Sequence, residues 1–172
     1  MSHYAETVSV SRNSWHPNYN KTGHIEDDIA VLTLARDVTW NNGKQPVCAP
    51  AGNDVSYNAS IATVSGWGTT SFLGPESNYL RATNIPIIPS VDCAKSFPSG
   101  MVTDDNVCAG HQGANDRAAC SGDSGGPLAV KNRNGQFEIV GIVSWGEDGC
   151  AGKTPGVYAQ VHYFMDWIKA QL

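Results

Sequence analysis

The sequence has 172 residues, of which 41% are hydrophobic, 18 are glycine and 9 are proline, and its formal net charge is −5. This length can bury one sizeable core, and glycine and proline spread without a period suit short strands joined by turns, so the predicted class is all-β. No run of lysine or arginine and no apolar run of about 20 residues occurs, which disfavours nucleic-acid and membrane partners.

The first predicted strand covers residues 29–34, a β-branched apolar run with charged residues on both sides, and we expect it to be buried. Further strands are predicted over residues 60–65 and 79–88, followed by a short helix over residues 90–96. Residues 128–130 and 137–143 are predicted to form a hairpin, because Asn134 and Gly135 between them are a strong turn signal.

The C-terminal residues show helical spacing. Phe164, Trp167, Ile168 and Leu172 fall at i, i+3, i+4 and i+8, which predicts one apolar stripe packed against the body of the protein.

The cysteines and two glycosylation sequons suggest an extracellular, secreted protein. Five cysteines occur, at 48, 93, 108, 120 and 150, and Asn20 and Asn58 each begin an acceptor sequence for glycosylation. No C-x-x-C pair suggests zinc, and we expect neither a metal site nor a cofactor. The odd count indicates that one cysteine has its partner elsewhere, on another chain or on a missing segment.

The most informative segment runs from Cys120 to Pro127, with the sequence Cys-Ser-Gly-Asp-Ser-Gly-Gly-Pro. A nucleophilic serine needs an exposed oxygen on a tight turn and backbone N–H groups that point at a developing oxyanion, and flanking glycines permit such a turn. Ser124 fits the nucleophile, and Gly122 and Ser124 could supply the N–H groups.

With this segment, the sequence resembles the chymotrypsin/trypsin family of serine endopeptidases. The resemblance extends to residues 27–32, 65–68, 144–146, 155–158 and 167–168, in the family's order. It implies a chymotrypsin-like double β-barrel in a single peptidase domain over residues 1–172, truncated at the N-terminus. Residues 1–45 would be the remnant of a largely missing first barrel, residues 46–160 a complete second barrel, and residues 161–172 a C-terminal helix.

The resemblance also assigns roles to the site residues. Ser124 becomes the nucleophile, with Gly122 and Ser124 as the oxyanion hole, and Asp28 the triad carboxylate, with Asp27 as a solvated neighbour. Asp123 resembles the aspartate that pairs with a new N-terminal amine after activation, since a buried carboxylate needs such a partner.

The cysteine pairs follow from the same resemblance. Cys93 would pair with Cys108, and Cys120 with Cys150. A further family disulfide would join positions 62 and 130, but both of its cysteines are absent here. Cys48 is left over, and we expect it to pair with the missing N-terminal segment.

The substrate pocket can be placed by counting from the nucleophile. Six residues before Ser124 stands Ala118, followed by Ala119, where trypsin-like members have an aspartate that binds arginine or lysine. Ser144, Trp145 and Gly146 resemble the strand that binds the substrate backbone, and Gly146 and Gly156 occupy wall positions. A neutral floor with open walls favours a large apolar or aromatic side chain over a basic one, although a slip in residues 113–117 would bring Asp116 inward instead.

No histidine has the family's Ala-His-Cys context. His3, His16 and His24 precede Asp28, and we expect His16 to be a solvated surface residue and His24 not to reach Ser124. His111 and His162 are expected on the surface. Without a base to accept the serine proton, we predict that the chain alone is inactive and does not react with a fluorophosphonate.

Three hypotheses follow. The first is a fragment of an active secreted serine endopeptidase that acts on protein or peptide substrates. The second is a non-catalytic protease homologue that binds protein partners. The third is an α/β-hydrolase, because Ser124, Asp148 and His162 have that family's triad order, but the residues after Ser124 are a poor helix start.

Overall fold

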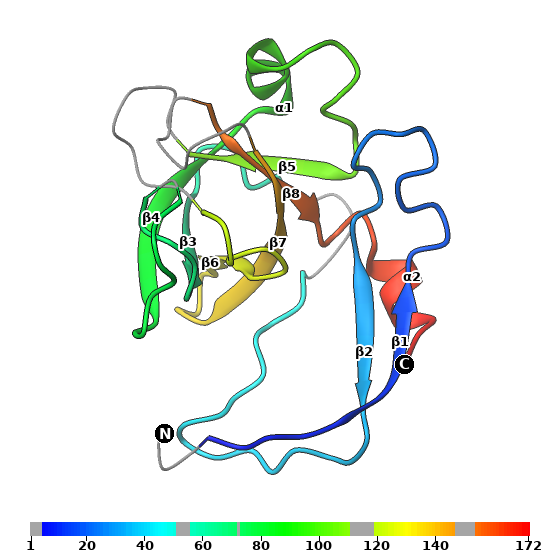
Figure 1. Ribbon diagram of the computed structural model, residues 1–172, viewed down its shortest axis with the longest axis vertical. Coiled ribbons are helices and arrows are strands. Elements are labelled where there is room, and N and C mark those ends of the chain that lie inside the picture. The colour runs from blue at the N-terminus through cyan, green and yellow to red at the C-terminus, as the bar shows by residue number, and fades with distance from the viewer. Residues whose placement is uncertain (1–4, 51–55, 72, 111–118, 147–153) are drawn as a thin grey trace.

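The computed structural model describes residues 5–50, 56–71, 73–110, 119–146 and 154–172, in a two-stranded sheet and a barrel (Figure 1). The elements in chain order are β1 (Val10–Trp15), β2 (Ala30–Leu34), β3 (Ile61–Gly66), β4 (Arg81–Ile88), α1 (Ser90–Cys93), a 3-10 turn (Ala94–Ser96), β5 (Asn106–Ala109), β6 (Pro127–Lys131), β7 (Phe137–Trp145), β8 (Gly156–Gln160) and α2 (Met165–Lys169).

Six antiparallel strands close into a barrel in the order β3-β4-β5-β8-β7-β6. Alternate side chains of each strand point inward, because successive residues of a strand face opposite sides. Ala62 and Val64 of β3 meet Ile85 and Ile87 of β4 in this way, and Leu128, Val130, Val140 and Tyr158 complete the buried interior. The all-β prediction is therefore confirmed, with one closed barrel, a small separate sheet and a short C-terminal helix.

The predicted hairpin between residues 128 and 143 is confirmed as β6 and β7. The Asn132 side-chain oxygen accepts hydrogen bonds from the N–H groups of Asn134 and Gln136, each at 3.0 Å. Gly135 has a φ of 77°, a left-handed conformation that glycine adopts without steric cost. Asparagine and glycine thus fix this turn for the reasons that make the pair a turn signal.

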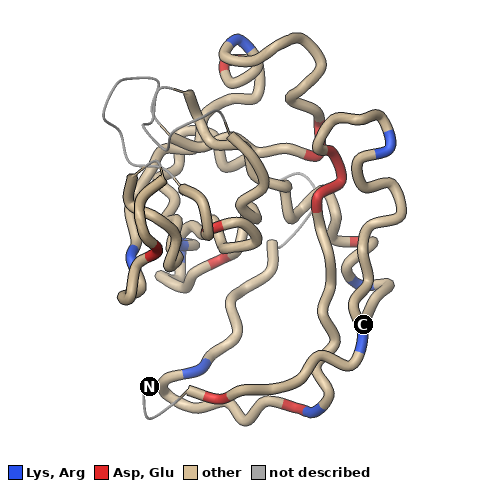
Figure 2. Tube along the Cα trace, viewed as in Figure 1, with Lys and Arg blue, Asp and Glu red and all other residues tan. Residues whose placement is uncertain are grey.

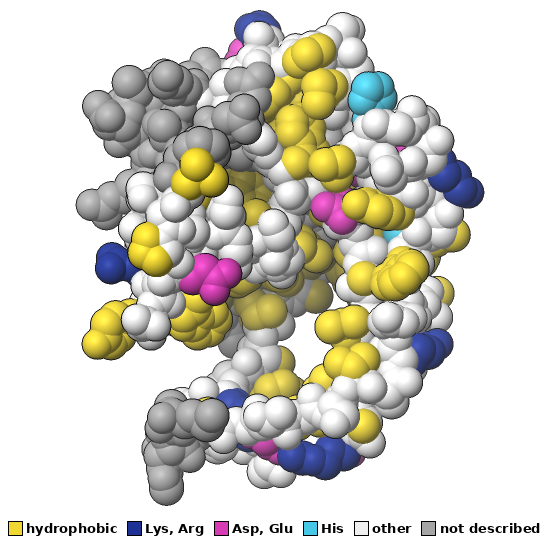
Figure 3. All heavy atoms as spheres, viewed as in Figure 1, with side chains coloured by type: hydrophobic (Ala, Val, Ile, Leu, Met, Phe, Trp, Pro, Cys, Tyr) yellow, Lys and Arg dark blue, Asp and Glu magenta, His cyan; other side chains and the backbone are white. Residues whose placement is uncertain are grey.

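The strand predicted over residues 29–34 exists as β2, but the expectation that it is buried is wrong. β2 pairs only with β1 in a two-stranded sheet. On one face of this sheet Leu32 is 58% exposed, Leu34 42% and Trp15 73%. Figure 3 shows hydrophobic side chains along this part of the surface. Among the described residues no further strand covers that face. The apolar side chains of β2 therefore stay exposed, because no second layer packs against them.

The C-terminal helix is confirmed in type, with one correction. Phe164 is buried, and Trp167 and Ile168 pack with it against Ile29 and Ala159, which ties α2 to both the barrel and the start of β2. Leu172 was expected on the same stripe but is 95% exposed. The helix ends at Lys169, so helical spacing no longer applies to residue 172.

One predicted disulfide is observed directly. Cys93 and Cys108 are bonded, with 6.2 Å between their Cα atoms, and they join α1 to β5. Cys120 is disulfide-bonded as well; its predicted partner, Cys150, lies outside the described residues. Cys48 is free within the described part of the chain. None of the helices in that part has the length and apolar character to cross a membrane.

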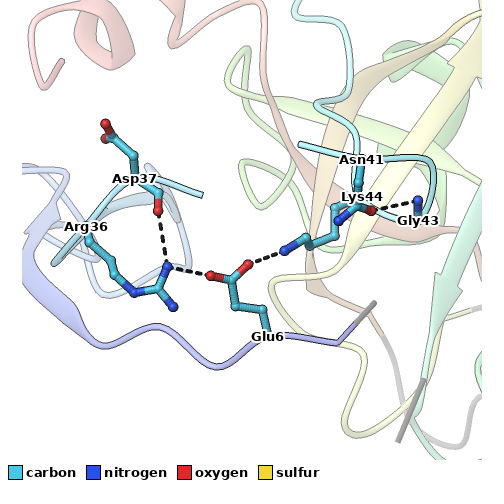
Figure 4. A network of polar contacts seen from close by, with 6 residues as sticks. All are labelled: Glu6, Arg36, Asp37, Asn41, Gly43 and Lys44. Carbon is cyan, nitrogen blue, oxygen red and sulfur yellow. Dashed lines mark hydrogen bonds and ion pairs between the residues drawn. The ribbon is translucent and has the colours of Figure 1, made fainter. Parts of the chain in front are cut away.

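A surface ion-pair network joins the segment before β1 to the segment after β2 (Figure 4). The Glu6 carboxylate accepts hydrogen bonds from the Arg36 guanidinium and the Lys44 ammonium, one on each oxygen. The Lys44 contact, then the Arg36 contact, lowers the pKa of Glu6 below its usual 4.5. The side chain of Asp37 takes no part, because only its backbone oxygen accepts from Arg36.

This network predicts a pH-dependent contribution to stability. A carboxyl whose pKa is lowered by folding stabilises the protein above its unfolded pKa, and this contribution disappears as the pH falls through the folded pKa. We therefore expect Glu6→Gln to lower the urea midpoint at pH 7, and the difference from wild type to shrink below about pH 4.5. Low ionic strength is needed because salt screens exposed pairs. Asp37→Asn is the matched control, and an equal loss in both variants would contradict the role of Glu6.

The register of β3 and β6 predicts an engineered disulfide. Ala62 lies directly opposite Val130, and both are buried. Directly opposed residues of antiparallel strands have Cα separations within the disulfide range. We expect the double variant Ala62→Cys and Val130→Cys to form the bond and to raise the free energy of unfolding by about 2–4 kcal/mol relative to the matched double serine variant. Mass spectrometry showing two free thiols at these positions would contradict the register.

Candidate active site

The turn that carries Ser124 connects the region after Cys120 to the start of β6. The N–H of Asp123 donates to the Cys120 oxygen at 2.9 Å, and the N–H of Gly126 donates to the Asp123 oxygen at 2.8 Å. Gly122 and Gly125 have φ values of 92° and 78°, which only glycine adopts readily. These are two consecutive tight turns, and Ser124 is exposed within the second.

The two N–H groups predicted for the oxyanion hole belong to this turn. No acceptor for the N–H of Gly122 or of Ser124 is found among the described residues. Backbone N–H groups without an acceptor, next to an exposed serine hydroxyl, can donate to an oxygen that gains negative charge. The local geometry is therefore compatible with the predicted role of both residues.

The Asp123 side chain fixes the turn to the end of β3. Its carboxylate accepts hydrogen bonds from the N–H of Gly68 at 2.8 Å and from the N–H of Cys120 at 2.9 Å. A Cβ atom on Gly66 would lie 2.0 Å from the nearer carboxylate oxygen, and one on Gly68 would lie 2.6 Å from it. The two glycines of the Ser65-Gly-Trp-Gly68 turn therefore provide the space for this carboxylate. Pairing of Asp123 with an N-terminal amine stays a prediction.

A short path of hydrogen bonds links the Ser124 turn to Asp28. The N–H of Gly125 donates to the Val143 oxygen, and the N–H of Val143 donates to the Gly126 oxygen, each at 2.9 Å. The next residue of β7, Ser144, donates its hydroxyl to an Asp28 carboxylate oxygen at 2.6 Å. The last strand residues of β7 thus hold both predicted catalytic residues at the same end of the barrel, although the two are 96 positions apart in the sequence.

The loop before β2 holds Asp28 in this position, and Asp27 is part of its anchor. The Asp27 N–H donates to the carboxylate of the buried Asp105 at 2.8 Å. Figure 2 shows the acidic stretch before β2 beside the acidic residues before β5. Burial, opposed by His16 and reinforced by Asp105, raises the pKa of Asp27. The expectation that Asp27 is merely a solvated neighbour is wrong, because its backbone and side chain both have partners.

The described histidines do not provide the missing base. His16 is only 13% exposed at its side chain, and its Nδ1 lies 3.4 Å from the Asp27 carboxylate, so the expectation of a solvated histidine is wrong. Its ring packs edge-on against Phe164 and Trp167 of the C-terminal region. The sequence could not reveal this burial, because the apolar partners lie about 150 residues away.

His24 is exposed, and His162 follows the far end of β8, where it contacts Gln160 and the ring of Tyr57. Val143, which touches the Ser124 turn, pairs with Tyr158. His162 lies beyond Gln160, the last residue of β8, and so past the end of that strand opposite to Gly156. His3 and His111 lie outside the described residues, and no group of three potential metal ligands occurs within the described part.

The predicted substrate pocket is partly described. Ala119 packs against the barrel core, while Ala118 and Asp116 lie outside the described residues. A Cβ on Gly146 would lie 3.9 Å from the Gly156 Cα, so the two glycines are neighbours as the resemblance implies. Trp145 packs edge-on against Phe97 at 5.0 Å. Tyr158, which was not predicted as a site residue, lies two residues after Gly156 on the same face of β8.

Asn20 and Asn58 are both exposed, as glycosylation would require. The third hypothesis, an α/β-hydrolase, is contradicted by the fold. The barrel is antiparallel, and a strand, β6, follows Ser124 where that family needs a helix.

Comparison with known proteins gives consistent matches along the chain. The family described as Trypsin matches residues 2–168. Trypsin-1 of Salmo salar is 43% identical over 172 residues, which cover 96% of this chain and 64% of that protein. Trypsin-2 of Salmo salar is 42% identical with 67% of its length covered, and trypsin-1 of Astacus astacus is 38% identical with 68% covered. The chain thus spans about two thirds of the length of these curated relatives.

The fit between Gly66 and Asp123 predicts a local stability effect. In Gly66→Ala the new methyl group would overlap the Asp123 carboxylate, which must shift and lose its hydrogen bond from Gly68. We expect the free energy of unfolding to fall by about 1–3 kcal/mol, as for other overpacked sites. Urea denaturation measures this change, with Gly146→Ala as the control because its nearest contact is an ordinary 3.9 Å. Equal stability of the two variants would show that Asp123 is not confined as described.

Proposed function

Because the chain belongs to the trypsin family of serine proteases, we propose that it carries the nucleophile and substrate pocket of a secreted serine endopeptidase. The observation that carries the proposal is the exposed Ser124 on a turn with two N–H groups that have no acceptor among the described residues. Disulfides and exposed sequons support secretion, since disulfides persist in oxidising compartments.

In the proposed reaction the Ser124 hydroxyl oxygen attacks the carbonyl carbon of a peptide bond. The carbonyl oxygen gains negative charge and accepts hydrogen bonds from the N–H groups of Gly122 and Ser124. The backbone of residues 144–146 aligns the substrate beside the turn. The acyl-enzyme on Ser124 is then released by water, in the order of steps used by serine proteases with a Ser-His-Asp triad.

The proton of Ser124 needs a base, and we propose that a histidine outside the sequence shown supplies it. The position of Asp28 supports this proposal. Ser144 donates a hydrogen bond to one of the Asp28 carboxylate oxygens and so holds the side chain in place. In a Ser-His-Asp triad, the aspartate orients the catalytic histidine through its carboxylate. The open apolar face of β1 and β2 supports it as well, since a further layer of protein would cover Leu32 and Leu34. The chain by itself is then inactive.

Substrate preference and regulation are part of the same proposal. A pocket that ends at alanines rather than aspartate favours apolar or aromatic side chains of peptide substrates over basic ones. The Asp123 carboxylate pairs with an amine that forms on activation. The positively charged amine is then a third partner of this carboxylate, beside the N–H groups of Gly68 and Cys120. Cys48 pairs with a cysteine outside the sequence shown.

Exogenous imidazole tests the assignment of Ser124. We predict that the chain alone does not react measurably with a fluorophosphonate, and that molar-range imidazole raises the labelling rate by about tenfold or more. This gain is expected to fall below the roughly 10²–10⁴-fold that a positioned base supplies. Mass spectrometry locates the label on Ser124.

Two variants make the result decisive. Ser124→Ala should abolish the imidazole-dependent labelling. Ser99→Ala should retain it, because Ser99 is an exposed serine outside the Ser124 turn. Labelling without imidazole would contradict the missing base. If imidazole has no effect on Ser124, the non-catalytic homologue that binds protein partners becomes the better explanation.

A further inference from the structure

The side chain of Glu76 lies beside Gly122, one of the two residues proposed to bind the oxyanion. A Cβ atom on Gly122 would lie 3.4 Å from Oε1 of Glu76 and 3.7 Å from its Cγ. Glu76 is exposed, and its carboxylate has no ion pair and no hydrogen bond among the described residues. An unpaired negative charge therefore lies next to the proposed oxyanion site.

Backbone contacts hold Glu76 at this place. Glu76 pairs with Thr69 in an antiparallel bridge within the segment that follows β3. The N–H of Thr69 donates to the oxygen of Ser121, the residue before Gly122, at 2.9 Å. This segment is therefore tied directly to the Ser124 turn, so the Glu76 carboxylate stays close to Gly122.

The two sides of the Ser124 turn meet different parts of the protein. On one side the turn is hydrogen-bonded to Val143 of β7. On the other side Gly122 lies against the Glu76 side chain. In the proposed reaction the acyl part of the substrate lies along residues 144–146, on the β7 side. The part of the substrate that leaves therefore extends from Ser124 toward Glu76.

We infer that Glu76 makes the reaction of Ser124 selective for substrates with a positive charge on the leaving-group side, such as a lysine or arginine directly after the cleaved bond. The inference rests on the proposed function and names the class of peptide that is favoured. A negative charge next to a developing oxyanion opposes it, and a cation on the substrate offsets this opposition. Arg81 does not replace that cation, because its Nε donates to the Ser77 hydroxyl at 3.1 Å.

Two phosphorylating probes that differ in one charge test the inference. Both are diethyl phosphorothiolates. One has a trimethylammonioethyl thiolate as its leaving group, and the other has the neutral isostere with a tert-butyl group in place of trimethylammonium. With imidazole as the base, the Ser124 oxygen bonds to phosphorus, the phosphorus–sulfur bond breaks, the thiolate leaves and imidazole takes the serine proton. Thiol release gives the rate, and mass spectrometry locates the label.

We expect the ratio of the cationic to the neutral rate to be about two- to fivefold higher in the wild-type chain than in Glu76→Gln at low ionic strength, as for an exposed charge pair. Comparison of the two proteins cancels the different reactivities of the leaving groups. The advantage should disappear in about 1 M salt, where charges are screened within about 3 Å. Asp37→Asn, which removes an exposed carboxylate from the segment after β2, should keep the wild-type ratio.

The other outcomes are distinguishable. Equal ratios in wild type and Glu76→Gln, with Ser124 labelled in both, overturn the inference and leave the proposed function standing. A wild-type ratio that does not change with salt overturns it as well, and this series needs no variant to fold. If neither probe labels Ser124 in the presence of imidazole, the proposed function fails and the inference fails with it.

Discussion

The position of the Asp123 carboxylate between Gly66 and Gly68 is the constraint on which the rest of the site depends. The carboxylate occupies space that any side chain at 66 or 68 would fill, and it accepts N–H groups from Gly68 and Cys120. A charged acceptor forms stronger hydrogen bonds than a neutral one, so these contacts fix the residue next to the nucleophile firmly. Because Ser124 follows directly, its backbone N–H and hydroxyl are placed by its neighbour rather than by contacts of their own.

Strand β7 of the closed barrel connects the Ser124 turn to Asp28. Val143 binds the turn through Gly125 and Gly126, and Ser144 then binds Asp28. Asp28 in turn depends on Asp27, whose N–H is held by Asp105 at the start of β5. The loop before β2 therefore contributes one carboxylate to the predicted site, and the barrel determines where that carboxylate lies.

The parts that could be predicted from the sequence are those that local chemistry determines. The Ser124 turn and the Asn134-Gly135 hairpin need particular residues because of their backbone angles, so nearby residues reveal them. The burial of His16 and the exposure of Leu32 could not be predicted, because both depend on distant or absent partner layers. β1 was missed because its sequence, Val-Ser-Arg-Asn-Ser-Trp, alternates weakly, and β5 because it is only four residues long.

Binding and proton transfer are separable in this molecule for a structural reason. The barrel core comes from β3 to β8 alone, and the oxyanion N–H groups and the glycine walls belong to segments that this core supports. The carboxylate of Asp28, which would orient a base, lies instead in the loop before β2, and no described residue covers the outer face of the β1–β2 sheet. Under the proposed function, the residues that would bind a substrate are thus held by the barrel independently of the base, because recognition needs only fixed partners. A base supplied from elsewhere would therefore change the rate of chemistry on Ser124, whereas the barrel alone sets the positions of Gly146 and Gly156.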